Sequence, residues 1–270
     1  MQPVRRINSS GLGERSIHMK PSSMISTAFM ILLVVAIPYP AAASDARGAK
    51  PDAVRSSLAL DSLEGLEIEA APETGVDPTK FKVDVVLYRG RRALHILNND
   101  TAMSASTPTG GQSLAIVKNS DFKDGTIEVD LVGMPREGAP DDCRGFIGVA
   151  FRVQDHGARF EAFYLRFTNG RADDQARRNH STQYVSQPDF PWFRLRKENP
   201  GVYESYVDIE QKAWTKVKIV VSGTKAQLYV NGAAQPSLIV NDLKLGDGHG
   251  QIALWTGSDT EAYFSQLKIE

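Results

Sequence analysis

The chain has 270 residues, with 31 lysines and arginines against 32 aspartates and glutamates, so its formal net charge at pH 7 is only −1. Because the basic residues are scattered and give no positive excess, the composition predicts no nucleic-acid partner. Cys143 is the only cysteine, which excludes a disulfide within the chain.

The N-terminus predicts a secretory signal peptide. Four basic residues precede the apolar stretch MISTAFMILLVVAI, residues 24–37, and three alanines follow at 41–43. The apolar stretch has about 14 residues, whereas a membrane-spanning helix needs about 20. We therefore expect residues 1–43 to be cleaved after Ala43, giving a secreted or periplasmic protein with no membrane partner in its mature form. An uncleaved signal anchor is the alternative.

The rest of the chain divides into a leader and one domain. Residues 44–62 show little apolar periodicity and predict a flexible leader. Residues 63–270 contain short runs of alternating apolar residues, bounded by Gly, Asn, Asp and Pro, which predict about a dozen strands and no long helix. The clearest runs are FKVDVVLY, RALHIL, SLAIVK, GTIEVDLV, GFIGVAFRV, RFEAFYLRF, TQYVS, TKVKIVVSG, KAQLYV, SLIV, GQIALWTG and EAYFSQLKI. This pattern indicates an all-β sandwich or barrel, with Asn231 and Gly232 at one hairpin turn.

One connection between predicted strands is unusually long. Residues 168–214 contain a single short strand-like piece, and a connection of this length in a compact domain is usually functional. It contains the run RADDQARRNHSTQY, residues 171–184, which combines three arginines, two aspartates, a histidine and several amides. We consider this run a candidate site, with a surface ion-pair network that only orders the loop as the alternative.

Four segments carry a resemblance to a known superfamily: GTIEVDLVG, RGFIGVAFRVQD, AWTKVKIVVSGTKAQLYVNG and GQIALWTGSDTEAYFSQLKI. Together they resemble the concanavalin A-like lectin/glucanase superfamily, particularly its laminin G-like and 3-keto-disaccharide hydrolase-like bacterial branches, over residues 63–270. The resemblance implies a jelly-roll sandwich of two antiparallel sheets, with carbohydrate as the usual ligand. It leaves the activity open, because this fold carries lectins, adhesion modules and glycosidases.

The catalytic motif of laminarinase-like glycosidases of this superfamily is incomplete here. That motif, Glu-x-Asp-x-x-Glu on one strand, places three carboxylates along one face. This chain has Glu128 and Asp130 but Gly133 at the third position. We therefore expect the two carboxylates to lie on the solvent face of an ordinary strand.

The residue types around the polar run suit a saccharide. Sugar recognition needs polar groups in fixed geometry together with aromatic rings for the apolar side of the sugar. Strand alternation places Tyr164 and Arg166 on the surface opposite Phe163, beside the run. Arginines favour a uronate or sulfate group. The predicted ligand-binding residues are Tyr164, Arg166, Arg171, Asp173, Gln175, Arg177, Arg178, Asn179, Gln183, Tyr184, Trp192 and Trp255.

We therefore expect a lectin-like domain that binds a saccharide through residues 164–206, with two alternatives. One is a glycoside hydrolase-like enzyme acting on an oxidised or acidic saccharide, with His180 and a carboxylate, Asp174 or Glu204, as acid and base. The other is an adhesion or scaffold module that binds protein. The sequence contains no Ser-His-Asp order, cysteine motif or phosphate-binding glycine loop.

A metal is weakly indicated. Asn241, Asp242 and Asp247 lie near glycines, as calcium ligands often do, but their spacing differs from that of an EF-hand loop. We expect no cofactor, with calcium as the alternative.

Overall fold

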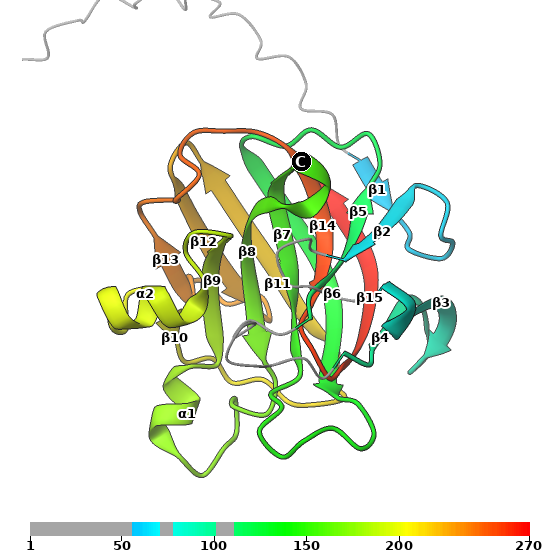
Figure 1. Cartoon of the computed structure of the whole chain (residues 1–270), viewed down its shortest axis with the longest axis horizontal. Coiled ribbons are helices and arrows are strands. Elements are labelled where there is room, and N and C mark those ends of the chain that lie inside the picture. Colours follow the sequence, from blue (N-terminus) through cyan, green and yellow to red (C-terminus); the bar gives the residue numbers. More distant parts are fainter. Residues whose placement is uncertain (1–55, 71–77, 101–110) are drawn as a thin grey trace, which may run out of the picture. The chain divides into compact units, whose positions relative to one another are not determined.

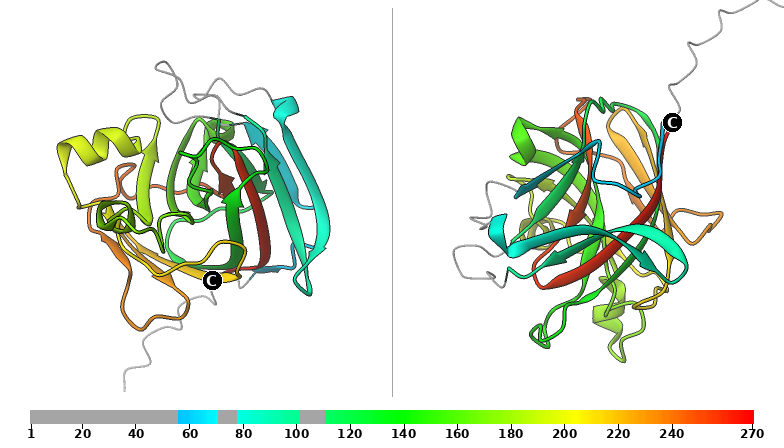
Figure 2. Two further views of the ribbon diagram at one scale, coloured as in Figure 1. Left: turned by 90° about the horizontal axis from the view of Figure 1, so that it is seen from below. Right: turned by 90° about the vertical axis from the view of Figure 1, so that its right-hand side faces the viewer.

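The computed structural model of the chain describes residues 56–70, 78–100 and 111–270, which belong to one compact unit. The predicted signal peptide, residues 1–43, lies outside the described residues. In the described part, two antiparallel β-sheets form two layers (Figure 1; Figure 2), which confirms the predicted all-β sandwich. The helices of this part are all too short or too polar to span a membrane.

The first sheet has eight strands in the spatial order β13-β12-β11-β6-β15-β4-β3, with β1 also paired to β15. Burial alternates along its strands: in β11, Val217 and Ile219 are buried, whereas Lys216 is exposed. This is the pattern of a sheet with one face in the core and one in solvent. The strands are β1 (Ser56–Leu58), β3 (Phe81–Tyr88), β4 (Arg91–Asn98), β6 (Gly125–Pro135), β11 (Thr215–Ser222), β12 (Lys225–Val230), β13 (Leu238–Val240) and β15 (Thr260–Ile269).

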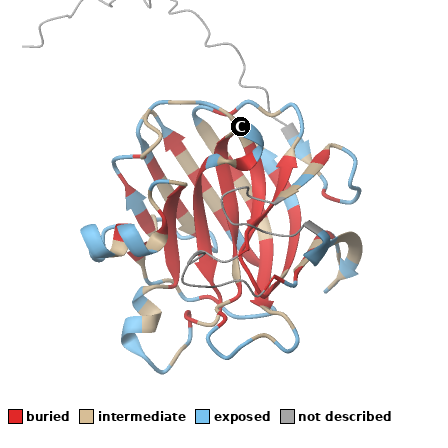
Figure 3. Ribbon diagram, viewed as in Figure 1, coloured by how far each residue is buried: buried red, intermediate tan, exposed pale blue. Residues whose placement is uncertain are grey.

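The second sheet has seven strands in the order β10-β9-β8-β7-β14-β5-β2. Its central strands are buried on both faces (Figure 3), unlike those of the first sheet. The strands are β2 (Leu66–Ala70), β5 (Ser113–Val117), β7 (Phe146–Gln154), β8 (Arg159–Arg166), β9 (Thr182–Gln187), β10 (Glu204–Ser205) and β14 (Gln251–Thr256). Other parts of the chain therefore cover the outer face of this sheet and shield it from water.

Two apolar clusters account for this double burial. The main core lies between the sheets and includes Phe151, Phe163 and Phe264, each at most 1% exposed; burying one such side chain contributes about 1.5–3 kcal/mol. A second cluster lies on the outer face of the seven-stranded sheet. Its members are Leu114, Ile116, Ala150, Val153, Phe160, Ala162, Tyr164, Val185, Ala253 and Trp255, with Phe146 and Trp192 packed against them.

The long connection, residues 168–214, is largely structured. It contributes β9 and β10 to the sheet and contains two short helices, α1 (Gln175–Asn179) and α2 (Trp192–Glu198). Asp174 caps α1 by accepting a hydrogen bond from the backbone N–H of Arg177 at 3.0 Å, a usual role for aspartate at this position. Helices of five and seven residues are too short to show a helical period in sequence, which explains why neither was predicted.

Two further predictions differ from the structure in part. The predicted leader ends too late, because β1 pairs with β15 and Leu60 is only 1% exposed; a three-residue strand gives no readable periodicity. Asn231 and Gly232 do adopt positive φ, 52° and 72°. However, the loop that they begin runs to Ser237 before β13, so it is longer than a two-residue hairpin turn.

The predicted position of Glu128 and Asp130 is confirmed. Both project from the solvent side of β6, where Glu128 pairs with Lys216 at 2.8 Å and Asp130 pairs with Arg91 at 2.5 Å. They stand on the face opposite the main core. Glu128 pairs with a residue of the adjacent strand β11, and Asp130 pairs with a residue of β4, on the far side of β15. Such pairs are ordinary on the solvent face of a sheet.

Candidate functional site

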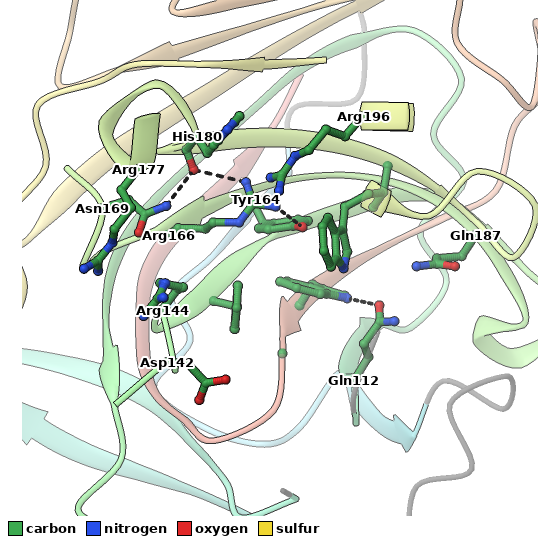
Figure 4. Close-up of a pocket in the computed structure, with 15 residues that line it drawn as sticks. Gln112, Asp142, Arg144, Tyr164, Arg166, Asn169, Arg177, His180, Gln187 and Arg196 are labelled. Carbon is green, nitrogen blue, oxygen red and sulfur yellow. Dashed lines mark hydrogen bonds between the residues drawn. The ribbon is translucent and has the colours of Figure 1, made fainter. Parts of the chain in front are cut away.

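A cavity of about 330 Å³ opens on the outer face of the seven-stranded sheet, over the second apolar cluster (Figure 4). It is lined by Gln112, Asp142, Arg144, Phe146, Tyr164, Arg166, Asn169, Arg177, His180, Val185, Gln187, Trp192, Arg196, Trp255 and Gly257. Its volume is at the small end of the range for ligand sites. The floor comes from strands, and the rim comes from the loop before β7 and from the α1 to α2 region.

The aromatic floor depends on a glycine. Gly148 of β7 lies directly between Tyr164 of β8 and Trp255 of β14 in the sheet register. With no side chain at Gly148, the two rings stack across it, with centroids 4.7 Å apart and planes 26° from parallel. A Cβ at this position would lie 2.6 Å from the Cα of Tyr164 and 2.1 Å from the carbonyl oxygen of Phe163. Gly148 therefore brings the two rings together.

The aromatic rings are fixed by their neighbours. The indole N–H of Trp255 donates to Gln112 Oε1 at 2.8 Å, and Phe146 packs edge-on to Tyr164 with centroids 6.1 Å apart. Trp192, on α2, lies under the guanidinium of Arg196, which is 4.8 Å from the ring centroid. The floor is thus ordered before any ligand arrives.

On one side of the rim, the buried carboxylate of Glu204 fixes the positions of three neighbouring side chains. Glu204 is 2% exposed and lies 3.5 Å from Arg166 Nη1 and 2.7 Å from His180 Nδ1. Arg196 donates to both of its carboxylate oxygens, at 3.0 and 3.1 Å from Nε and 2.5 Å from Nη2. Arg166 also donates to the hydroxyl of Tyr164 at 3.0 Å. A buried carboxylate is tolerated only when it is paired and hydrogen-bonded in this way.

The environment also sets two protonation states. Burial lowers the pKa of His180, and the nearby Arg196 and Arg166 add to this effect while Glu204 opposes it. Burial likewise raises the pKa of Tyr164, so its phenol stays protonated. At neutral pH the rim therefore offers a neutral imidazole and an intact hydroxyl.

The adjacent part of the rim carries Arg144 and Arg177, with Asn169 and Asp142 beside them (Figure 4). Burial lowers the pKa of Arg144, and the positive charge of Arg177 is the next largest cause. The two guanidinium groups are therefore close enough to repel each other.

The structure brings half of the predicted ligand-binding set to the cavity and its wall. Tyr164, Arg166, Arg177, Trp192 and Trp255 line the cavity, as does the predicted catalytic candidate His180. Gln183 lies behind the wall, where its side-chain oxygen accepts from Arg166 at 2.9 Å. Glu204 and Asn179 line a neighbouring hollow that shares His180.

The other predicted residues lie away from the cavity. Arg171 pairs at the surface with Asp208 and Glu210, each at 2.8 Å. Asp173 is exposed, and Asp174 caps α1 rather than facing a ligand. Gln175 donates to Asn179 at 2.7 Å, and Arg178 donates to the hydroxyl of Tyr206 at 2.9 Å. These contacts match the ion-pair and loop-ordering alternative for this part of the run.

The prediction for Tyr184 is wrong. Its side chain is fully buried in the core between the sheets, and its hydroxyl donates to Glu161 at 2.8 Å. Neighbouring residues of a strand point to opposite faces, so Gln183 and Tyr184 of β9 cannot both face the cavity. Gln183 takes the outer face and Tyr184 the inner one.

Several cavity residues were not predicted, notably Arg144, Asn169, Gln187, Gln112 and Arg196. For Arg196 a signal existed, because it lies four residues after Trp192 and such pairs share one face of a helix. For Gln112 and Arg144 no signal existed, since they come from distant segments that only the sheet topology brings together.

The two aspartates considered as calcium ligands, Asp242 and Asp247, form ion pairs with lysines of the protein. Asp242 accepts from the hydroxyl of Tyr203 at 2.7 Å and from Lys244 at 2.6 Å. Asp247 pairs with Lys123 at 3.0 Å. Among the described residues, the group whose ligand atoms lie close enough to share a metal ion is elsewhere: Glu67, Glu69 and His156, within 4.8 Å of one another. Calcium binding by this chain stays the alternative to the expectation of no cofactor.

No family model and no curated protein matches the chain. Similar solved structures include the carbohydrate-binding module CBM66 from Bacillus subtilis, at 13% identity and TM-score 0.46, covering 71% of this chain and 96% of that chain. A prokaryotic β-1,3-1,4-glucanase (lichenase) derived from a mouse hindgut metagenome is similar at 13% identity and TM-score 0.45, covering 80% and 98%. The VIP36 exoplasmic/lumenal domain, in its Ca²⁺/Man3GlcNAc-bound form, is similar at 9% identity and TM-score 0.47, covering 79% and 87%. At these identities the likenesses concern the fold and assign no role to any residue of this chain.

Proposed function

We propose that the protein is a lectin-like domain that binds a saccharide in the cavity above Tyr164 and Trp255. The observation that carries this proposal is the combination of a fixed aromatic floor with a rim of polar groups. The apolar face of a sugar ring packs on aromatic rings, while its hydroxyls need donors and acceptors at the edge. Arg144, Asn169, Gln112 and Gln187 supply such groups around the floor.

The binding function is better supported than glycoside cleavage. Most glycosidases use two carboxyl groups roughly 5 to 10 Å apart on either side of the scissile bond. Asp142 is the only carboxylate among the described residues that line the cavity. Glu204 is held by two arginines and lies behind the wall, and Asp174 caps α1 at the surface. Neither is placed to act with Asp142 across a bound sugar.

The test is binding of the purified protein to a panel of neutral and acidic oligosaccharides, followed by thermal unfolding and calorimetry. A ligand that binds the native state raises the unfolding midpoint. Trp192→Ala should lower the affinity for any hit by about tenfold to a hundredfold, because stacking and apolar contact with the ring are lost. Trp214→Ala is the matched control, since Trp214 packs against Tyr88 on the eight-stranded sheet.

The outcomes separate the three functions. A hit weakened by Trp192→Ala and unchanged by Trp214→Ala supports saccharide binding at the cavity. Release of new reducing ends from the same ligand would favour the enzyme. A panel without any hit would contradict both and favour a protein-binding module.

We also propose that the protein acts outside the cytoplasm, which rests on the signal peptide predicted for residues 1–43. N-terminal sequencing of the mature protein from the periplasm or medium should then begin at Ser44. A protein retained with its full N-terminus would contradict this.

A further inference from the structure

The arginines around the cavity differ in whether a carboxylate of the protein compensates their positive charge. Four arginines line it, and Asp142 is the only carboxylate among its described lining residues. On one side, Arg166 and Arg196 share the buried carboxylate of Glu204, at 3.5 and 2.5 Å. The positive charges of those two arginines are therefore compensated by a carboxylate of the protein. The other two, Arg144 and Arg177, are the candidates for binding an acidic group of a ligand.

Arg144 and Arg177 make weaker contacts. Arg144 Nη1 donates to the backbone carbonyls of Asp141 and Cys143, at 3.1 and 3.4 Å. Arg177 Nη2 donates to Thr168 Oγ1 at 3.3 Å. Among the residues that the structure describes, neither guanidinium has a carboxylate oxygen within ion-pair distance. Two neighbouring cations thus lie at the cavity, and neither forms an ion pair with a described residue.

Other polar groups at the same end are also unsatisfied. Asn169 is 3% exposed, and its amide nitrogen donates to the carbonyl of His180 at 3.1 Å, whereas its side-chain oxygen has no hydrogen-bond partner. The buried Nε of Arg177 has none either. Polar atoms buried without partners are unfavourable by about 1–3 kcal/mol each in general. A folded protein keeps such groups rarely, and often at functional sites.

The arrangement in Figure 4 shows why one ligand would use the whole cavity. Arg144 and Arg177 lie together at one end of the cavity, beside Asn169, and Arg166 and Arg196 follow along the rim. A sugar ring above Tyr164 and Trp255 would direct one substituent toward Arg144 and Arg177. A planar guanidinium binds an oxyanion through two parallel hydrogen bonds.

We propose that Arg144 and Arg177 form an oxyanion subsite that binds the acidic group of the saccharide, a uronic acid carboxylate or a sulfate ester. This inference rests on the proposed function and narrows its ligand to acidic saccharides. Asp142, on the same side, limits the positive charge and disfavours ligands with an acidic group at every position around the ring.

The experiment uses matched ligand pairs on the purified protein. Oligogalacturonate is compared with its methyl ester, and a sulfated galactan oligosaccharide is compared with its desulfated form, by calorimetry. The subsite predicts that the acidic member of at least one pair binds about tenfold or more tightly than the neutral member, since charge-assisted hydrogen bonds are lost on neutralisation. This preference should shrink as salt is raised from about 0.05 to 0.5 M, because salt screens the charges.

Variants then locate the preference. Arg144→Met and Arg177→Met should each reduce the ratio of the acidic to the neutral affinity by about tenfold, because the acidic group loses more than a hydroxyl loses when the guanidinium is removed. Arg171→Met is the matched control, because it removes the same charge from the surface, where Arg171 pairs with Asp208 and Glu210. It should leave the preference unchanged.

The results distinguish this inference from the proposed function. Equal affinity for both members of each pair, in the unaltered protein, would overturn the oxyanion subsite and leave saccharide binding in place. Binding of no saccharide at all would overturn both. An acidic preference equally sensitive to Arg171→Met would also overturn the subsite, because the effect would then be one of net charge. Since the matched pairs are measured first on the unaltered protein, an unstable variant does not prevent a decision.

Discussion

Replacing Glu204 with glutamine tests the buried charge cluster behind the cavity. Glu204 is 2% exposed and compensates Arg166, which is 6% exposed, and Arg196, which is 35% exposed. Removing one partner of a buried ion pair typically destabilises a protein by about 3–5 kcal/mol. Arg196 keeps part of its hydration, so we expect the low end, about 3 kcal/mol. For a domain of this size, that corresponds to a fall of about 6–12 °C in the unfolding midpoint.

The assay is urea and thermal unfolding followed by circular dichroism and tryptophan fluorescence, whose agreement checks two-state behaviour. Glu198→Gln is the control, because Glu198 is 47% exposed and pairs with Arg194 one helical turn away; it should change stability by about 0.3–0.5 kcal/mol. If Glu204→Gln destabilises the protein no more than Glu198→Gln does, Glu204 is not the counterion that fixes the rim, and the assignment of Arg166 and Arg196 as satisfied groups is wrong.

Two further predictions concern single side chains. Burial lowers the pKa of His180 below its ordinary 6.5. The unfolded chain therefore binds a proton at this histidine more readily than the folded chain does. The stability that neutral His180 contributes is present above pH 6.5 and is lost as the pH falls through the lowered pKa of the folded protein. The difference in unfolding free energy between the unaltered protein and His180→Gln should therefore shift against the unaltered protein between pH 7.5 and 5; a constant difference would contradict this. Tyr184→Phe should lower stability by about 1–3 kcal/mol in urea unfolding, since its hydroxyl donates to Glu161 and accepts from the Lys244 N–H, each at 2.8 Å. Its saccharide affinity should match that of Tyr229→Phe, which removes a hydroxyl from β12 of the eight-stranded sheet, away from the cavity. A selective loss of affinity in Tyr184→Phe would return Tyr184 to the site.

The fold was largely predictable because most of its strands show a recognisable alternation of apolar and polar residues in the sequence. The runs at 81–88, 125–132 and 215–222 alternate in sequence and become β3, β6 and β11. Strands recruited by pairing rather than by periodicity were missed: β1 has three residues and β10 has two. Such short strands form because a strand of the folded sheet offers them free backbone hydrogen-bonding groups. This partner strand is known only once the sheet topology is known.

The candidate site was predictable only where one strand set its geometry. Alternation in β8 correctly placed Tyr164 and Arg166 on the face opposite Phe163. The polar run was harder, because residue types alone do not say whether a side chain faces a cavity, caps a helix or pairs at the surface. Arg177 and Arg178 are neighbours, yet one lines the cavity and the other contacts Tyr206.

The empty position at Gly148 gives a criterion for recognising this site in other chains. Three adjacent strands, β8, β7 and β14, build the aromatic floor. The middle strand, β7, has no side chain at Gly148, so the rings from the two outer strands can meet across it. A homologue that keeps both aromatic residues but has any side chain at the position of Gly148 would lose the stacked pair, because the new Cβ would meet backbone atoms. Conservation of this glycine, which no ligand needs to touch, would thus mark inheritance of the floor more reliably than conservation of the arginines around it.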